Sequence, residues 1–212
     1  MRPVTVCSCC LVLAMCCASS AVPAEGDWIP LFNGKDLTGW KQHPDDTNKW
    51  EVKDGALTAS GEGNGHLYTE RGDYENVVFR IEAKINDKGN SGQYFRTKFE
   101  PGFPKGYEAQ INATGGDAIQ TGSLYPDART PLAKHKDKIT VMNTAAHKPD
   151  EWFTQEVTAI GPKITIKVNG KTTIEFEDPE KLYATGHFAL QGHDPGSIMS
   201  FRKIEVKELK AK

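Results

Sequence analysis

The sequence predicts a single all-β domain built as two antiparallel sheets packed face to face. Short runs in which apolar and polar residues alternate recur along the 212 residues, at the spacing typical of a β-sandwich. Two of the connections, Asp54-Gly55 and Asn169-Gly170, are residue pairs that favour tight hairpin turns. No stretch has a sustained helical period, and no repeat or linker divides the chain, so we expect one domain over residues 25–212.

The first 24 residues have the layout of a secretory signal peptide. Arg2 is followed by a short apolar run and then by small residues, which is the order that precedes signal cleavage. The apolar run is too short to cross a bilayer, so we expect no membrane span and an exported protein, in the periplasm or outside the cell. All five cysteines lie in this segment, and the alternative to cleavage alone is a lipoprotein acylated at Cys16 or Cys17.

Composition and motifs exclude several classes of function. The net charge of −2 argues against nucleic acid as a partner, because phosphate binding needs a clustered basic excess. The predicted mature chain has no cysteine for a thiol nucleophile, no G-x-S-x-G and no glycine-rich phosphate loop. No motif requires a cofactor. A divalent metal held by His193, Glu108 and a third residue stays open, although the spacing of the histidines does not indicate one.

In the first half of the chain, four segments fit the sandwich. Trp28–Trp40 supplies apolar core anchors, and Trp50–Thr58 is typical of a hairpin. His66–Glu70 is a short strand candidate whose histidine we expect at the surface. Val77–Ile85 alternates cleanly, with its odd-numbered members facing a core.

The second half continues the pattern after one irregular stretch. Gly115–His147 is expected to form long loops with at most short strands, and loops of this length are often functional. The remaining apolar runs are expected to form a strand over Trp152–Ile160, a hairpin over Ile164–Phe176, and strands over Gly186–His193 and Ile198–Leu209.

The stretch Asn90–Ile111 holds the candidate site, as two strand-like runs joined by a Gly/Pro-rich connection. Side chains alternate across a strand, so the polar members of these runs can share the face opposite the core. The same alternation applies to Gly186–His193. If the three strands are neighbours, the side chains that meet are those of Arg96, Glu108, Gln110, Gln191 and His193.

This set of residue types suits a carbohydrate. Amide and guanidinium groups bind sugar hydroxyls in bidentate fashion, and Tyr94 or Tyr125 could offer a flat face. Glu108 or His193 could transfer protons. Glucanases of β-sandwich fold typically carry E-x-D-x-E, whereas residues 108–112 read E-A-Q-I-N, with amides where further carboxylates would be. The sequence therefore predicts either a lectin-like binder or a hydrolase that uses another route than paired carboxylates.

Several motifs together resemble the 3-keto-disaccharide hydrolase family, a bacterial family of exported proteins. The matching segments, in the family's order, are Phe32–Trp40, Asn90–Arg96, Gly106–Ile111, Thr121–Tyr125, Val168–Gly170, Leu190–His193 and Ser200–Ile204. The resemblance covers nearly the whole mature chain. It implies a concanavalin A-like jelly roll and a small carbohydrate ligand, a keto-disaccharide or related glycoside.

The resemblance also implies a chemistry that needs no second carboxylate. A sugar oxidised at C3 has an acidic proton at C2, so a base can remove it and the glycosidic oxygen at C1 leaves by elimination, with water adding afterwards. Glu108 or His193 is then the base or the acid. Motif membership adds Asn90 and Ser91 to the substrate-binding residues expected above, which are Arg96, Gln110, Gln191, Tyr94 and Tyr125. A non-catalytic glycan-binding module is the alternative.

Overall fold

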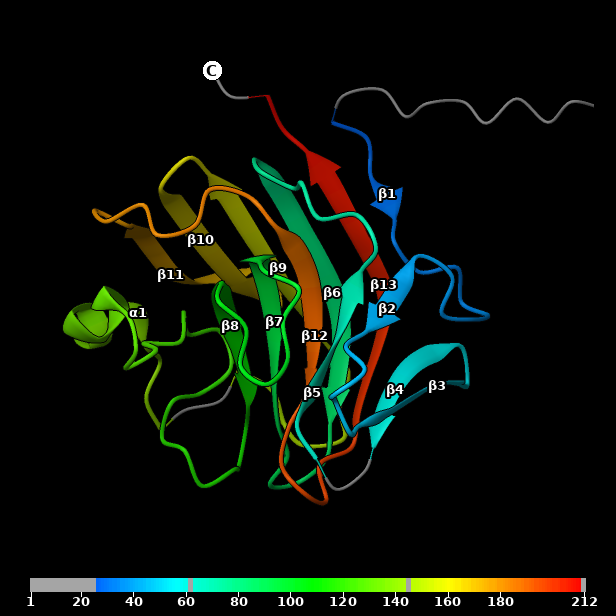
Figure 1. The fold of residues 1–212 in the computed structure, drawn as a ribbon. Helices are drawn as coiled ribbons and strands as arrows, with labels where there is room; N and C mark the ends of the chain where they lie inside the picture. Colours follow the sequence, from blue (N-terminus) through cyan, green and yellow to red (C-terminus); the bar gives the residue numbers. More distant parts are fainter. Residues whose placement is uncertain (1–25, 61–62, 144–145, 211–212) are drawn as a thin grey trace, which may run out of the picture.

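The computed structural model describes residues 26–60, 63–143 and 146–210, and it confirms a sandwich of two antiparallel sheets (Figure 1). The predicted signal peptide, residues 1–24, lies outside the described residues. In the part of the chain that is described, no helix is both long enough and apolar enough to cross a membrane.

The larger sheet has eight strands in the order β11-β10-β9-β6-β13-β4-β3, with β1 added along β13. Its strands are β1 (Ile29–Pro30), β3 (Lys49–Lys53), β4 (Ala56–Ser60), β6 (Val77–Ile85), β9 (Phe153–Ile160), β10 (Lys163–Val168), β11 (Lys171–Glu177) and β13 (Met199–Glu208). The turns of two of its hairpins, at Asp54-Gly55 and Asn169-Gly170, have positive φ at both residues. This is the type I′ geometry that the residue pairs predict.

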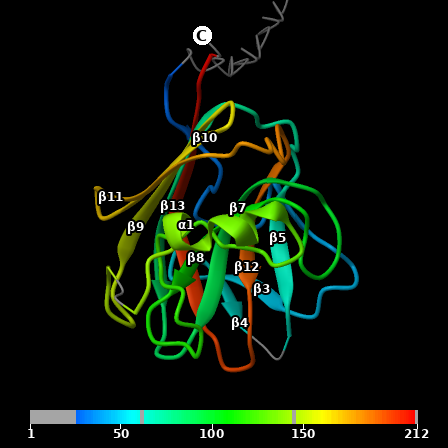
Figure 2. The same ribbon diagram turned by 90° about the vertical axis from the view of Figure 1, so that its left-hand side faces the viewer.

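The smaller sheet has five strands in the order β2-β5-β12-β7-β8. It packs against the larger sheet, and the two layers are seen apart in Figure 2. Its strands are β2 (Trp40–Gln42), β5 (Gly65–Thr69), β7 (Asn90–Thr97), β8 (Tyr107–Asn112) and β12 (His187–Gly192). Its inner face supplies the predicted core residues Tyr107, Ala109 and Ile111, all fully buried.

Two glutamines join the sheets across the core. Gln93 of β7 donates to the carbonyl of Phe79 in β6 (3.1 Å), and Gln155 of β9 donates to the carbonyl of Ala109 in β8 (3.2 Å). Around them the core is aromatic, with the rings of Phe79 and Phe188 stacked at 4.0 Å between centroids. Because each bond uses a main-chain carbonyl of the opposite sheet, the two layers are held at a fixed offset.

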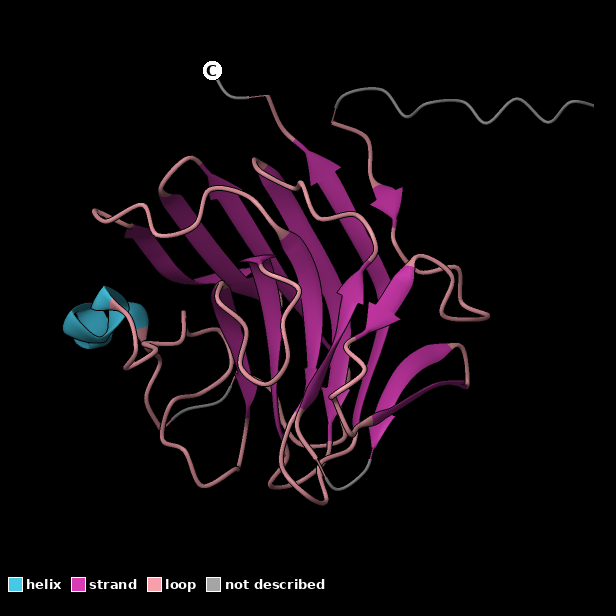
Figure 3. Ribbon diagram, in the orientation of Figure 1, coloured by secondary structure: helices cyan, strands magenta, loops and turns pink. Residues whose placement is uncertain are grey.

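The irregular stretch differs from the expectation of loops with at most short strands. It contains a 3₁₀ helix over Pro131–His135, capped by the Thr130 hydroxyl, and a short helix α1 over Lys136–Ile139, the helical segments in Figure 3. The buried side chains of Leu132 and Ile139 attach this part to the core. The preceding segment runs antiparallel along β8, where Leu124 forms an isolated bridge with Ala109.

A β-bulge in β7 corrects the predicted position of Arg96. Between Tyr94 and Thr97 two residues of β7 lie opposite one residue of β12, and Arg96 takes a positive φ of 50°. The extra residue breaks the alternation of faces. Arg96 is 2% exposed, and its guanidinium donates to the carbonyls of Glu75 (2.8 and 2.9 Å) and Gly161 (2.7 Å). The expectation that it shares a polar face with Glu108 is therefore wrong.

We expect the change Arg96→Met to lower the free energy of unfolding by about 3 kcal/mol, because buried carbonyls lose their charged donor. Urea unfolding at pH 7 measures this. The control is Arg202→Met on the outer face of the larger sheet, where Arg202 pairs with Glu82 and the side chain is 40% exposed. That change should cost at most about 1 kcal/mol. Equal losses in the two variants would contradict the anchoring role of Arg96.

Candidate active site

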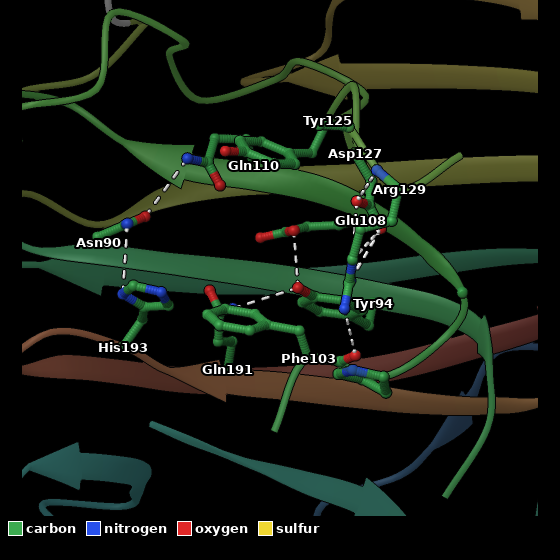
Figure 4. Close-up of a pocket in the computed structure, with 13 residues that line it drawn as sticks. Asn90, Tyr94, Phe103, Glu108, Gln110, Tyr125, Asp127, Arg129, Gln191 and His193 are labelled. Atoms are coloured by element: carbon green, nitrogen blue, oxygen red, sulfur yellow. Dashed lines mark hydrogen bonds and ion pairs between the residues drawn. The ribbon is translucent and has the colours of Figure 1, made fainter. Parts of the chain in front are cut away.

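A pocket of about 340 Å³ opens on the outer face of the five-stranded sheet, the face turned away from the core (Figure 4). Strands β7, β8 and β12 form its floor. Two loops form its walls, one over residues 98–106 between β7 and β8 and one over residues 125–129. The volume falls in the range of roughly 300–1,000 Å³ that small-molecule sites have.

Seven of the nine predicted site residues meet in this pocket. They come from β7, β8 and β12, from the loop that holds Tyr125, and from the residue directly after β12, His193. The three strands are neighbours, since β7 pairs with β8 on one side and with β12 on the other. Tyr94 thereby lies directly opposite Glu108 in β8 and Ala189 in β12. The seven residues are Asn90, Tyr94, Glu108, Gln110, Tyr125, Gln191 and His193.

Arg96 and Ser91 do not line the pocket. Arg96 is anchored elsewhere by the bulge. Ser91 lies on the inner face of β7, fully buried, and its hydroxyl donates to the carbonyl of Gln191 in the neighbouring strand (2.6 Å). Its predicted place among the substrate-binding side chains is wrong, because motif membership did not take account of which face the residue occupies.

Phe103, Asp127 and Arg129 line the pocket and were not predicted as site residues. All three lie in loops, where the alternation of faces gives no information. The sequence does carry weak signals for them. Phe103 stands between prolines in the connection of the candidate stretch, and Asp127 and Arg129 directly follow the motif that ends at Tyr125.

Glu108 is held by a chain of directed hydrogen bonds. Tyr94 donates its hydroxyl proton to Glu108 Oε2 at 2.7 Å, and the side-chain amide of Gln191 donates to the Tyr94 oxygen at 3.2 Å. Because Gln191 occupies the Tyr94 oxygen as a donor, the phenol proton points to the carboxyl group. Gly92 makes the space, since a Cβ at this position would lie 2.3 Å from Glu108 Oε1.

Burial raises the pKa of Glu108 to about 8, and the charge of Asp127 acts in the same direction. The hydrogen bond from Tyr94 opposes the shift. Gln110 is next to the carboxyl group. With its amide turned so that both polar atoms are satisfied, its nitrogen donates to Glu108 Oε1 and to the Ser91 carbonyl, each at 3.1 Å. Glu108 is therefore poised to gain or lose a proton near neutral pH.

His193 lies at the end of the pocket beside Asn90, with 17% of its side chain exposed. Its Nδ1 is 2.6 Å from Asp194 Oδ1, and the Asn90 amide donates to the other Asp194 oxygen at 3.3 Å. A carboxylate on Nδ1 holds a proton there and leaves Nε2 for exchange with a ligand. The ring of Phe103 lies 5.3 Å from the imidazole, between centroids.

Asp127 is the second carboxylate of the pocket, and Arg129 engages both of its oxygens. Nε of Arg129 donates to Oδ1 at 2.9 Å and Nη2 donates to Oδ2 at 2.8 Å. These bonds lower the pKa of Asp127 despite its partial burial. The same guanidinium donates through Nη1 to the carbonyl of Phe103 at 3.1 Å, so Arg129 joins the two loops at the mouth of the pocket.

His66 is fully buried beneath this site, which corrects its expected surface position. Its ring packs edge-on against Tyr94 at 4.8 Å between centroids, and neither nitrogen makes a hydrogen bond to any described residue. The loop over residues 98–106 covers this part of the outer face, with Phe99 on Tyr68. Burial lowers the pKa of His66 to about 3, and His193 adds to the shift.

Within the described ranges, no three histidine, cysteine, aspartate or glutamate side chains gather as metal ligands would. His193, Glu108 and Asp127 line the same pocket but do not come together as metal ligands. The geometry thus adds no support to the divalent metal that the sequence leaves open.

Residues 27–207 match the family model described as the 3-keto-alpha-glucoside-1,2-lyase-like domain. No curated protein sequence matches the chain significantly.

Solved structures share the fold at low sequence identity. A Parabacteroides distasonis protein, assigned provisionally as a glycosyl hydrolase, is 23% identical, with a TM-score of 0.69 over 86% of this chain and 94% of that one. The carbohydrate-binding module CBM66 from Bacillus subtilis is 13% identical, with a TM-score of 0.62 over 80% and 96%. A B. subtilis protein with a galectin-like fold is 11% identical, with a TM-score of 0.57 over 88% and 96%. These likenesses support the predicted concanavalin A-like sandwich.

We expect His66 to make the fold sensitive to acid. Its pKa is lowered in the folded state. Below about pH 6.5 the histidine therefore binds a proton in the unfolded chain but stays neutral in the folded protein. His66 therefore contributes a loss of stability as pH falls, on the order of 3 kcal/mol between pH 7 and pH 4. The raised pKa of Glu108 acts in the opposite sense over this range, so the effect of His66 is the difference between the variant and the wild type. In His66→Phe this loss should be absent. Urea unfolding at both pH values compares the variants.

Met142→Ala provides the control, because it changes an exposed apolar side chain and no titratable group. It should keep the wild-type dependence on pH. If His66→Phe and the wild type lose the same stability on acidification, His66 is protonated in the folded protein and its proposed exclusion from solvent is wrong.

Proposed function

Because this chain belongs to the 3-keto-alpha-glucoside-1,2-lyase-like family, we propose that it cleaves 3-keto-glycosides by elimination. Family membership supports a function in carbohydrate chemistry. The finer statement, that the substrate is a glycoside oxidised at C3 and the reaction begins with proton abstraction at C2, is the proposal.

The observation that carries the proposal is the state of the two carboxyl groups in the pocket. A glycosidase that works on ordinary glycosides needs two carboxyl groups free to act on opposite sides of the bond. Here Asp127 has both oxygens engaged by Arg129, which leaves Glu108 as the pocket carboxylate able to act on a ligand. One base of raised pKa suits abstraction of a proton next to a ketone better than displacement at C1.

The reaction then proceeds through an enolate. Glu108 takes the C2 proton, and the C2–H electron pair moves to form the enolate of the C3 ketone. The C1–O bond breaks as the C1–C2 double bond forms, and the leaving oxygen takes a proton from His193. Addition of water across the double bond gives the free 3-keto sugar, so the net result is hydrolysis.

The remaining pocket groups hold the sugar. Gln110 holds Glu108 through its amide nitrogen, and Asn90 supplies a donor for the oxygen on which enolate charge develops. Gln191 orients Tyr94, and Tyr94 in turn fixes the rotamer of Glu108. Tyr125 closes the pocket on the β8 side and accompanies the amides as a ligand for hydroxyl groups.

We propose further that the protein works outside the cytoplasm, as its signal-like N-terminus predicts. The alternative to the enzyme is a lectin-like module that binds glycans without turnover, since this fold also serves such proteins.

Turnover of a 3-keto-glucoside and of its unoxidised parent separates these functions. We expect the mature domain, residues 25–212, to release the leaving group from the keto compound alone, with and without chelator. Release that stops with chelator would require a metal. Release from the parent would instead point to Asp127 as a second catalytic carboxylate. Binding without release from either compound would favour the lectin-like module.

We expect Glu108→Gln to lower kcat/KM by about 10²–10⁴-fold, because the base is lost while the amide still accepts from Tyr94. Glu51→Gln, an exposed control on β3, should match the wild type.

In the wild type, kcat/KM should fall about tenfold per pH unit below about pH 8, because the base must be deprotonated. Tyr94→Phe should move this limb to higher pH, since its hydrogen bond holds the pKa of Glu108 down. A limb that stays in place in Tyr94→Phe would assign it to another group.

A further inference from the structure

Phe103 is an exposed aromatic side chain at a binding pocket. The described part of the chain exposes five large apolar side chains, and of these Phe103 alone lines the pocket. It is 43% exposed and stands on the wall formed by the loop between β7 and β8 (Figure 4). Aromatic rings at pocket walls supply a large contact area with few rotatable bonds.

The loop presents this ring in a fixed position. Pro101 and Pro104 flank it closely and restrict the backbone. Glu100 fastens the loop twice, because its carboxylate accepts from the amide of Lys105 (2.6 Å) and its carbonyl accepts from the Tyr68 hydroxyl (2.8 Å). The bond from Arg129 to the carbonyl of Phe103 fixes the tip. A ligand would therefore meet a preformed surface, which lowers the entropic cost of binding.

The neighbours of Phe103 indicate which part of a substrate it would contact. Its ring lies 5.3 Å from the imidazole of His193, whereas Glu108 forms its hydrogen bond with Tyr94 on the sheet that floors the pocket. In the proposed reaction His193 protonates the leaving oxygen. The group attached to that oxygen must then emerge beside Phe103.

We propose that Phe103 forms the binding subsite for the leaving group and selects leaving groups with a flat apolar face. A second pyranose ring has such a face, formed by its C–H groups, and so does an aryl group. This inference rests on the proposed function and deepens it, since it assigns specificity to a residue outside the catalytic set. A small leaving group such as methanol gains nothing from the ring.

The test compares two substrates that share the reacting sugar, a 3-keto disaccharide and the 3-keto methyl glucoside. In Phe103→Ala, kcat/KM for the disaccharide should fall roughly tenfold or more through a higher KM, because the ring's apolar contact is lost. The value for the methyl glucoside should stay within about threefold. Phe103→Trp should keep kcat/KM for the disaccharide near the wild-type value. The hydrogen bond from Arg129 uses the main chain, so these substitutions leave it intact, and Phe103→Ala removes only the contact of the guanidinium with the ring, 5.8 Å from its centroid.

Phe99→Ala is the matched control, because Phe99 lies on the same loop, is 37% exposed and packs on Tyr68 outside the pocket. It should leave the ratio of the two substrates unchanged. Equal losses on both substrates in Phe103→Ala, or no loss on either, would overturn the subsite. A wild type without turnover of either keto compound would instead overturn the proposed function, and the subsite with it.

Discussion

The register between β7 and β8 is the constraint on which the site depends. Pairing Tyr94 with Glu108 places a phenol against a carboxyl group on the outer face, while the alternate residues of both strands fill the core. A shift by one residue would exchange the two faces, so the hydrophobic core itself enforces the position of the carboxyl group. Gln93 and Gln155 add bonds between the sheets that hold the same register. The apolar packing that stabilises the fold thereby also positions the proposed base.

The surroundings of the two carboxyl groups of the pocket shift their pKa values in opposite directions. Glu108 lies on the sheet floor of the pocket beside a neutral phenol and amides, and its pKa is raised. Asp127 stands on a loop with a guanidinium, and its pKa is lowered. Two carboxyl groups whose pKa values are shifted apart in this way can take different roles in one site. Glu108 can exchange a proton near neutral pH, whereas Asp127 stays charged and orients Arg129 across the pocket mouth.

Alternation of apolar and polar residues predicts the sandwich and the strand residues Glu108, Gln110 and Gln191 that converge on the pocket, and the Asp-Gly and Asn-Gly pairs predict its hairpins. It failed where the regular period fails. The bulge at Arg96 leaves no trace in the period, because one extra residue in one strand becomes visible only against its partner. His66 was misplaced because a polar face usually meets water, whereas a loop distant in sequence covers this one. Asp127 and Arg129 lie in a loop, where position follows from tertiary contacts and not from sequence spacing.

The closure of the β7–β8 loop has a consequence for engineering. The main-chain amide of Lys98 donates to the carbonyl of Lys105 where the loop leaves the sheet. The residues between them form a loop whose two ends are fixed by β7 and β8. Grafting a different segment between these two lysines would leave the strands and their register untouched. Replacing this loop would change the wall of the pocket, and with it the choice of ligand. Glu108 and His193, which lie outside the loop, would keep their positions.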